Sequence, residues 1–304
     1  MSLRIRQMTI TTAAVFLVCM IVSCTGPDTS VPKYEPLYAE DSSSSQILTL
    51  GVTSLAAYEK HTPFCQYLNK RLPGNIRIQM VATNGLADFI AKTSKQKFSI
   101  VLVNGETAVE SLKSGYSIVA KYENDNDYKG VVITRNDVLI QQAGDLKGKT
   151  ITCPGPEALA GTKMPLYYLA THGLDLNKDL LITYVSTFES VYMNVYLRKS
   201  YAGTVALSTW ENLTKTKLKI ASALTPQFIT EPLPNLALLV RNDIPAEVQR
   251  KFLELIFNMN KDPDAQKILM EIGATSFVSA NADSYKSVGV FLDKYQKITS
   301  LSLP

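Results

Sequence analysis

Charged, hydroxyl and aromatic side chains follow the ends of several predicted strands, and they are the residues best suited to hold a ligand. The carboxyl ends of parallel strands meet at one edge of a sheet, where helix N-termini expose unpaired N–H groups. We therefore expect these side chains to converge. They are Thr53, Ser54, Asn104, Gly105, Glu106, Thr107, Glu157, Gly161, Thr162, Phe188, Glu189, Ser208, Thr209 and Trp210.

Three of these residues, Glu106, Glu157 and Glu189, are carboxylates at positions where a pocket for an anion would prefer neutral or basic groups. Together with the nearby aromatic rings of Phe188, Tyr192 and Trp210, they favour a cationic or amphipathic organic ligand, held partly by cation–π contacts.

Helix capping is the alternative role for the same glutamates. Ser186 and Glu189 have capping-box spacing, and Glu106 follows Asn104 in the first turn of a predicted helix. Taken singly, each glutamate fits capping better than ligand binding. Trp210 fits a packing role and a ligand-contacting role equally well.

Enzyme chemistry has little support in the sequence. Its two histidines, His61 and His172, lack metal-ligand spacing, and GxSxG, Walker A and dinucleotide-binding motifs are missing. We expect no catalysis, no cofactor and no metal.

The first 23 residues have the layout of a secretory signal. Arg4 and Arg6 precede an apolar stretch from Met8 to Val22, which is shorter than the roughly 20 residues of a spanning helix. Because Cys24 follows directly after Ser23, the segment resembles a bacterial lipoprotein signal, in which this cysteine is lipidated. An uncleaved anchor and an ordinary cleaved signal are the alternatives.

Residues 24–46 are rich in proline and serine and are expected to form a flexible linker that spans about 25 Å. Loss of Arg4 and Arg6 with the signal leaves 29 basic and 27 acidic side chains. This near-neutral balance, with scattered basic residues, gives no support for nucleic-acid binding.

From Ile47 onward, short apolar runs alternate with helical patterns, which predicts an α/β fold with parallel strands. The rhythm occurs twice, and we expect two lobes. Residues 47–128 and 282–304 form the first, and residues 129–281 form the second. Leu218–Ala221 is predicted as a strand in the second lobe.

Only Cys65 and Cys153 remain for a disulfide once Cys19 and Cys24 are assigned to the signal and the lipid. An oxidising compartment permits the bridge, but two isolated cysteines are weak evidence for it. Two buried free thiols are the favoured interpretation.

The stretch Asp145–Ile151, with the segment Pro154–Gly161 and the tripeptide Met164-Pro165-Leu166, resembles the phosphate, phosphite and phosphonate substrate-binding proteins of ABC transporters. This resemblance implies a type 2 periplasmic-binding-protein fold with a ligand cleft between the lobes. It also implies a small-molecule ligand, an ABC permease as partner and, for a lipoprotein, attachment to the membrane at the periplasmic or outer face. A binding protein of the same fold that signals to a membrane receptor is the alternative. We expect a monomer.

The chain departs from the family at its anion-binding loop. Ala158, Leu159 and Ala160 stand where the family has hydroxyl side chains, Phe188 lies near the usual histidine, and Ala202 replaces the usual aspartate. We therefore expect a divergent pocket.

Overall fold

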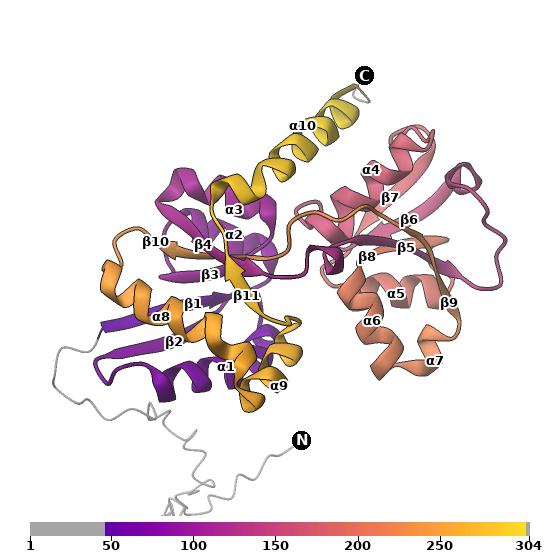
Figure 1. Cartoon of the computed structure of the whole chain (residues 1–304). Coiled ribbons are helices and arrows are strands. Elements are labelled where there is room, and N and C mark those ends of the chain that lie inside the picture. The colour runs from indigo at the N-terminus through magenta and orange to yellow at the C-terminus, as the bar shows by residue number, and fades with distance from the viewer. Residues whose placement is uncertain (1–45, 302–304) are drawn as a thin grey trace, which may run out of the picture. The chain divides into compact units, whose positions relative to one another are not determined.

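Figure 1 shows the computed structural model of the chain, which describes residues 46–301. The predicted signal, nearly all of the predicted linker and Cys24 lie outside the described residues. Within residues 46–301, no helix combines the length and the apolar character needed to cross a membrane.

The first lobe is built on a six-stranded mixed sheet. Its strands are β1 (Gln46–Val52), β2 (Ile76–Ala82), β3 (Ile100–Val103), β4 (Tyr116–Tyr122), β10 (Ala237–Arg241) and β11 (Phe277–Ser279). They lie in the order β11-β4-β10-β3-β1-β2. β1 pairs in parallel with β2 and β3, while β10 lies antiparallel between β3 and β4.

Helices cover both faces of this sheet. Successive strand residues point to opposite faces, so one buried strand contributes apolar side chains to both layers of helices. Leu238 and Val240 of β10 belong to one buried cluster, and Ala237 and Leu239 belong to another. The first cluster takes in residues of α1 (Leu55–Arg71), α8 (Ala246–Asn258) and α9 (Pro263–Ile272). The second takes in residues of α2 (Leu86–Ser94), α3 (Gly105–Ser111) and α10 (Lys286–Leu301).

The second lobe is built on a five-stranded sheet. Its strands are β5 (Gly130–Arg135), β6 (Lys149–Cys153), β7 (Leu180–Tyr184), β8 (Ala202–Ala206) and β9 (Leu224–Ile229), in the order β7-β6-β8-β5-β9. Its helices are α4 (Met164–Thr171), α5 (Phe188–Tyr196), α6 (Leu207–Thr216) and α7 (Leu218–Ala221). Two sheets with flanking helices confirm the predicted α/β class.

The chain passes between the lobes along residues 123–129 and returns along residues 230–236. Polar contacts tie the two passages together. The Asn235 side chain donates to the Asn124 carbonyl at 2.7 Å, and the Thr230 amide donates to the Gly130 carbonyl at 2.9 Å. The buried Tyr285 hydroxyl donates to the Asn235 carbonyl at 2.5 Å, so the start of the C-terminal helical region also holds this crossing.

The predicted boundary of the second lobe is wrong. We expected residues 129–281 in that lobe, but β10 and β11 pair with β3 and β4 of the first sheet. Helices α8 and α9, which lie between them in sequence, pack on the same sheet. The apolar pattern of β10 suits a buried strand in either sheet, so it does not reveal the partner.

Helix α10 also departs from its predicted place in the first lobe alone. Val288 lies in the second buried cluster of the first lobe, whereas Tyr295 and Ile298 pack against the cluster of the second lobe that contains Cys153. One helix therefore contacts the cores of both lobes.

The strand predicted at Leu218–Ala221 is wrong too, because this segment is the short helix α7. Leucine, lysine and alanine are all good helix formers, and four residues are too few for periodicity to decide. The edge position in the sheet is taken by β9 instead.

Phe252→Ala is expected to destabilise the first lobe. The ring is 1% exposed between α8 and the sheet, so its removal leaves a cavity and should cost about 3–5 kcal/mol of unfolding free energy. Urea unfolding followed by circular dichroism measures this. The matched control is Met270→Ala in α9, whose side chain is 68% exposed and whose loss should cost at most about 0.5 kcal/mol. Equal effects of the two changes would contradict the assignment of α8 to this core.

The two thiols of the described chain are expected to be unreactive in the folded protein. Cys65 and Cys153 are free and buried, and burial raises the pKa of each to about 11. Since the thiolate is the reactive form, alkylation at pH 8 should be slower by about tenfold or more than in guanidinium chloride. Peptide mass spectrometry gives both rates. Rapid labelling of native Cys153, or a disulfide under non-reducing conditions, would contradict this expectation.

Candidate ligand-binding site

At the carboxyl end of β1, the predicted site residues Thr53 and Ser54 accept hydrogen bonds from backbone amides. The Ser54 hydroxyl accepts a hydrogen bond from the Ala57 amide at 3.1 Å and caps α1. The Thr53 carbonyl accepts from the Gly85 amide at 2.9 Å. Both side chains are partly exposed at the sheet edge, with the Ser54 hydroxyl committed to the cap.

At the carboxyl end of β3, three predicted residues place α3 against α10. The Asn104 side chain accepts from the Thr107 amide at 2.9 Å, and Gly105 and Thr107 are buried. A Cβ atom on Gly105 would lie 2.7 Å from a methyl carbon of Val288, so only glycine permits this approach. The tight packing fixes the backbone from which Glu106 projects.

Glu106 forms an ion pair with Lys163, which lies in the second lobe just before α4. Their side chains are 16% and 17% exposed, respectively. Among the ion pairs of residues 46–301, this is the one in which both partners are so well shielded from water. The Oε1 atom of Glu106 accepts the lysine, while Oε2 is buried without a hydrogen-bond partner within the described part of the chain.

Two tyrosines lie within the electrostatic reach of Glu106. Burial raises the pKa of Tyr128 and of Tyr295, and the negative charge of Glu106 raises both further. A hydrogen bond with the Ala160 backbone acts in the opposite direction on Tyr128. The carboxylate is therefore poorly solvated and lies within electrostatic reach of two tyrosines.

Lys163 ends a π-helical turn, Leu159–Lys163, that leads into α4. Such turns are rare and occur often at functional sites. The Thr162 hydroxyl donates to the Gly155 carbonyl at 2.6 Å, so it holds the loop after β6 together. Ala158, Leu159 and Ala160 are buried, and their side chains offer no hydrogen-bond donor.

The same turn makes an apolar contact with the first lobe. Leu159, Ala160 and Met164 belong to the buried cluster that contains Phe89 and Val288. A Cβ on Gly130 would lie 2.5 Å from the Ala160 carbonyl oxygen, which shows how closely β5 supports the turn. This packing brings Lys163 to the edge of the first sheet.

Gly161 and Phe188 are predicted site residues that lie apart in the sequence, and the structure brings them into contact. A Cβ on Gly161 would approach the Phe188 ring to 2.5 Å. Phe188 and Trp210 are partly buried and pack against the second-lobe cluster that contains Val191. Trp210 therefore has a packing role, whatever else it contacts.

The capping box predicted for Ser186 and Glu189 is wrong. Thr187 caps α5, and its hydroxyl accepts from the Ser190 amide at 3.1 Å. Glu189 is exposed and pairs with Lys217, whose hydrogen bond lowers the pKa of Glu189.

The remaining predicted residues lie near the edge of the second sheet. Ser208 and Thr209 lie in the first turn of α6, with Ser208 exposed. Glu157 is partly exposed, and a Cβ on Gly155 would lie 3.1 Å from one of its carboxylate oxygens. A ligand-binding role for these residues remains a prediction.

Sequence reasoning missed Lys163, Tyr128 and Tyr295. Lys163 carried a usable signal, because a cation at the start of a helix opposes the helix dipole and calls for an acidic partner. The two tyrosines lie outside the strand ends, and only the packing of the lobes brings them near Glu106.

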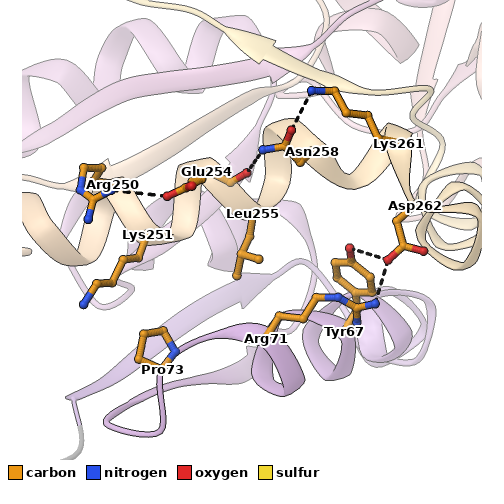
Figure 2. Close-up of a pocket in the computed structure, with 10 residues that line it drawn as sticks. All are labelled: Tyr67, Arg71, Pro73, Arg250, Lys251, Glu254, Leu255, Asn258, Lys261 and Asp262. Atoms are coloured by element: carbon orange, nitrogen blue, oxygen red, sulfur yellow. Dashed lines mark hydrogen bonds and ion pairs between the residues drawn. The ribbon is translucent and has the colours of Figure 1, made fainter.

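A surface hollow of about 570 Å³ lies elsewhere, between α1 and α8. Figure 2 shows that two ion pairs join charged groups in its lining, one at Asp262 and one at Glu254. Asp262 accepts from the Tyr67 hydroxyl at 3.0 Å and from Arg71 at 2.7 Å, and Arg250 pairs with Glu254. The hollow is lined by none of the predicted site residues.

Comparison with solved structures shows the fold of periplasmic binding proteins. A binding component of an ABC phosphonate transporter from Pseudomonas aeruginosa is 18% identical, with a TM-score of 0.76 over 85% of this chain and 89% of that one. PhnD1 from Prochlorococcus marinus in complex with methylphosphonate is 18% identical, with a TM-score of 0.74 over 83% and 98%. XAC2383 from Xanthomonas citri bound to ATP is 17% identical, with a TM-score of 0.69 over 84% and 99%.

A comparison with curated protein sequences found no significant match. A family model does match, over residues 52–285, and its description is "ABC transporter, phosphonate, periplasmic substrate-binding protein". The match spans β2 to β11 of both lobes. The chain therefore belongs to the periplasmic substrate-binding proteins of phosphonate ABC transporters.

Proposed function

We propose that this protein is a lipid-anchored solute receptor that captures a small charged molecule between its lobes and delivers it to an ABC permease. The observation that carries the proposal is the meeting of Glu106 and Lys163. One follows β3 of the first sheet and the other follows β6 of the second, so both sheet edges contribute a charged group to one place.

Closure of two lobes around a ligand provides a simple signal to a permease, which needs only to distinguish the closed form from the open one. The two interlobe passages are short and joined by hydrogen bonds, and they suit this role because a few residues of such segments can absorb a hinge motion.

The pocket is proposed to differ from one that grips a phosphonate with hydroxyl groups. The side chains of residues 158–160 supply no donors, and the Thr162 hydroxyl is already bonded to Gly155. Glu106 would repel a phosphonate dianion placed near it, although Lys163 would attract one. A ligand with a cationic or zwitterionic group fits these charges better.

A ligand panel tests the proposal. We expect methylphosphonate and inorganic phosphate to leave the melting temperature of the mature protein unchanged, and a member of a panel of small amines and zwitterions to raise it. Glu106→Gln keeps the shape of the side chain but loses its charge, and should weaken that binding by about tenfold or more. Calorimetry checks each affinity.

The exposed carboxylate of Glu189 supplies the matched control, since Glu189→Gln should leave the affinity unchanged. Tight binding of methylphosphonate that survives Glu106→Gln would contradict the proposed pocket. Failure of every panel member would contradict a charged small-molecule ligand.

Cys24→Ser is expected to release the protein from the membrane fraction or to leave its signal uncleaved. The reason is that the proposed lipid is attached to the Cys24 sulfur, and lipid chains provide the membrane affinity. Membrane fractionation and mass spectrometry of the mature N-terminus measure the outcome. An unmodified Cys24 in the wild-type chain would rule out the anchor, while Cys19→Ser serves as the control that should change neither result.

A further inference from the structure

The Glu106 carboxylate has the features of a binding site for an ammonium group, and Lys163 already fills it. The carboxylate is largely shielded from water, and one of its two oxygens accepts the lysine. Water competes poorly for a charge in such surroundings, which strengthens its attraction for a cation. An ammonium group is the cation that the chain itself supplies.

The second oxygen, Oε2, retains unused acceptor capacity. It is buried and has no hydrogen-bond partner among residues 46–301. A buried acceptor without a partner is costly, so a second donor reaching this oxygen would be favoured. Lys163 satisfies only half of the carboxylate in this structure.

Two tyrosines lie within the electrostatic reach of this carboxylate. The negative charge of Glu106 raises the pKa of both Tyr128 and Tyr295, beyond the effect of their burial. Ring faces attract cations, and poorly solvated ones do so more strongly. The surroundings therefore favour an organic ammonium ion over a hydrated metal ion.

The backbone that carries Lys163 is held by apolar packing independent of the ion pair. Leu159 and Met164, on either side of the π-helical turn, are 1% and 2% exposed in the cluster shared with the first lobe. The lysine is therefore presented to Glu106 by its neighbours, while its own long side chain can rotate away without unfolding the turn.

We propose that Lys163 is an internal surrogate ligand, whose ammonium occupies the cation subsite of Glu106 until the ammonium group of a bound molecule replaces it. This inference rests on the proposed function and specifies its ligand class as a small organic ammonium compound. It also makes Lys163 a specificity-determining residue, because a ligand without a cation cannot displace it.

Removal of the lysine side chain should leave a vacant ammonium subsite. We expect propylammonium chloride to bind the mature Lys163→Ala protein saturably and to raise its melting temperature, relative to the same concentration of sodium chloride. The affinity should exceed that of the Lys163→Ala/Glu106→Gln double variant by about tenfold, the value of one charge-assisted hydrogen bond. Equal affinities of the two variants would overturn the proposal.

Two further variants control for charge and space. Lys163→Met keeps most of the side-chain volume without the charge, and should not bind propylammonium because the subsite is filled. Lys217→Ala breaks the exposed pair with Glu189 and should create no such site. Propylammonium binding by Lys217→Ala as tight as that by Lys163→Ala would show a nonspecific effect and contradict the proposal.

A measurement on the intact chain applies even if Lys163→Ala fails to fold. Reductive methylation followed by peptide mass spectrometry should modify Lys163 more slowly than Lys217, whose side chain is 40% exposed. Glu106→Gln should accelerate methylation of Lys163 and leave the rate at Lys217 unchanged. Equal rates at the two lysines in the wild-type chain would overturn the proposal.

The two hypotheses can fail separately. If a panel amine binds the wild-type chain but Lys163→Ala gains no propylammonium site, the surrogate-ligand proposal is wrong and the receptor function stands. If Lys163→Ala gains the site but no panel member binds the wild-type chain, the proposed function is wrong and the subsite remains.

Discussion

The largely buried ion pair of Glu106 and Lys163 is the interaction that links the edges of the two sheets. Removing two charges from water is costly, and their attraction repays that cost only when the geometry brings them together closely. The chain meets this condition with apolar packing on both sides of the pair. Gly105 lets α3 approach α10, and Leu159 and Met164 bury themselves beside the first lobe.

The same packing accounts for the apolar character of the loop after β6. Alanine and leucine occupy the positions after β6 and face an apolar cluster, so hydroxyl groups there would be buried without partners. The loop makes a hydrophobic contact with the first lobe and ends in the cationic side chain of Lys163. Helix α10 strengthens this arrangement because it contacts the cores of both lobes.

Much of the fold could be predicted from local patterns, while the pairing of distant segments could not. Apolar runs, or alternation of apolar and polar residues, predict the strands β1, β2 and β6. This pattern lies within each segment itself, because it shows which faces of the strand are buried. The place of β10 between β3 and β4 could not be predicted, because the run Ala-Leu-Leu-Val suits either sheet. Four residues at α7 were likewise too few to separate helix from strand.

The residues alone determined the α/β rhythm, the likeness to a binding-protein family at Asp145–Ile151 and the position of Glu106 just after a strand end. These features depend on local order along the chain. Only the tertiary structure decided that Glu106 meets Lys163, 57 positions away, and that Tyr128 and Tyr295 lie within its electrostatic reach. The physical reason is that burial, which gives this charge pair its strength, is produced by both lobes together and is encoded in no single segment.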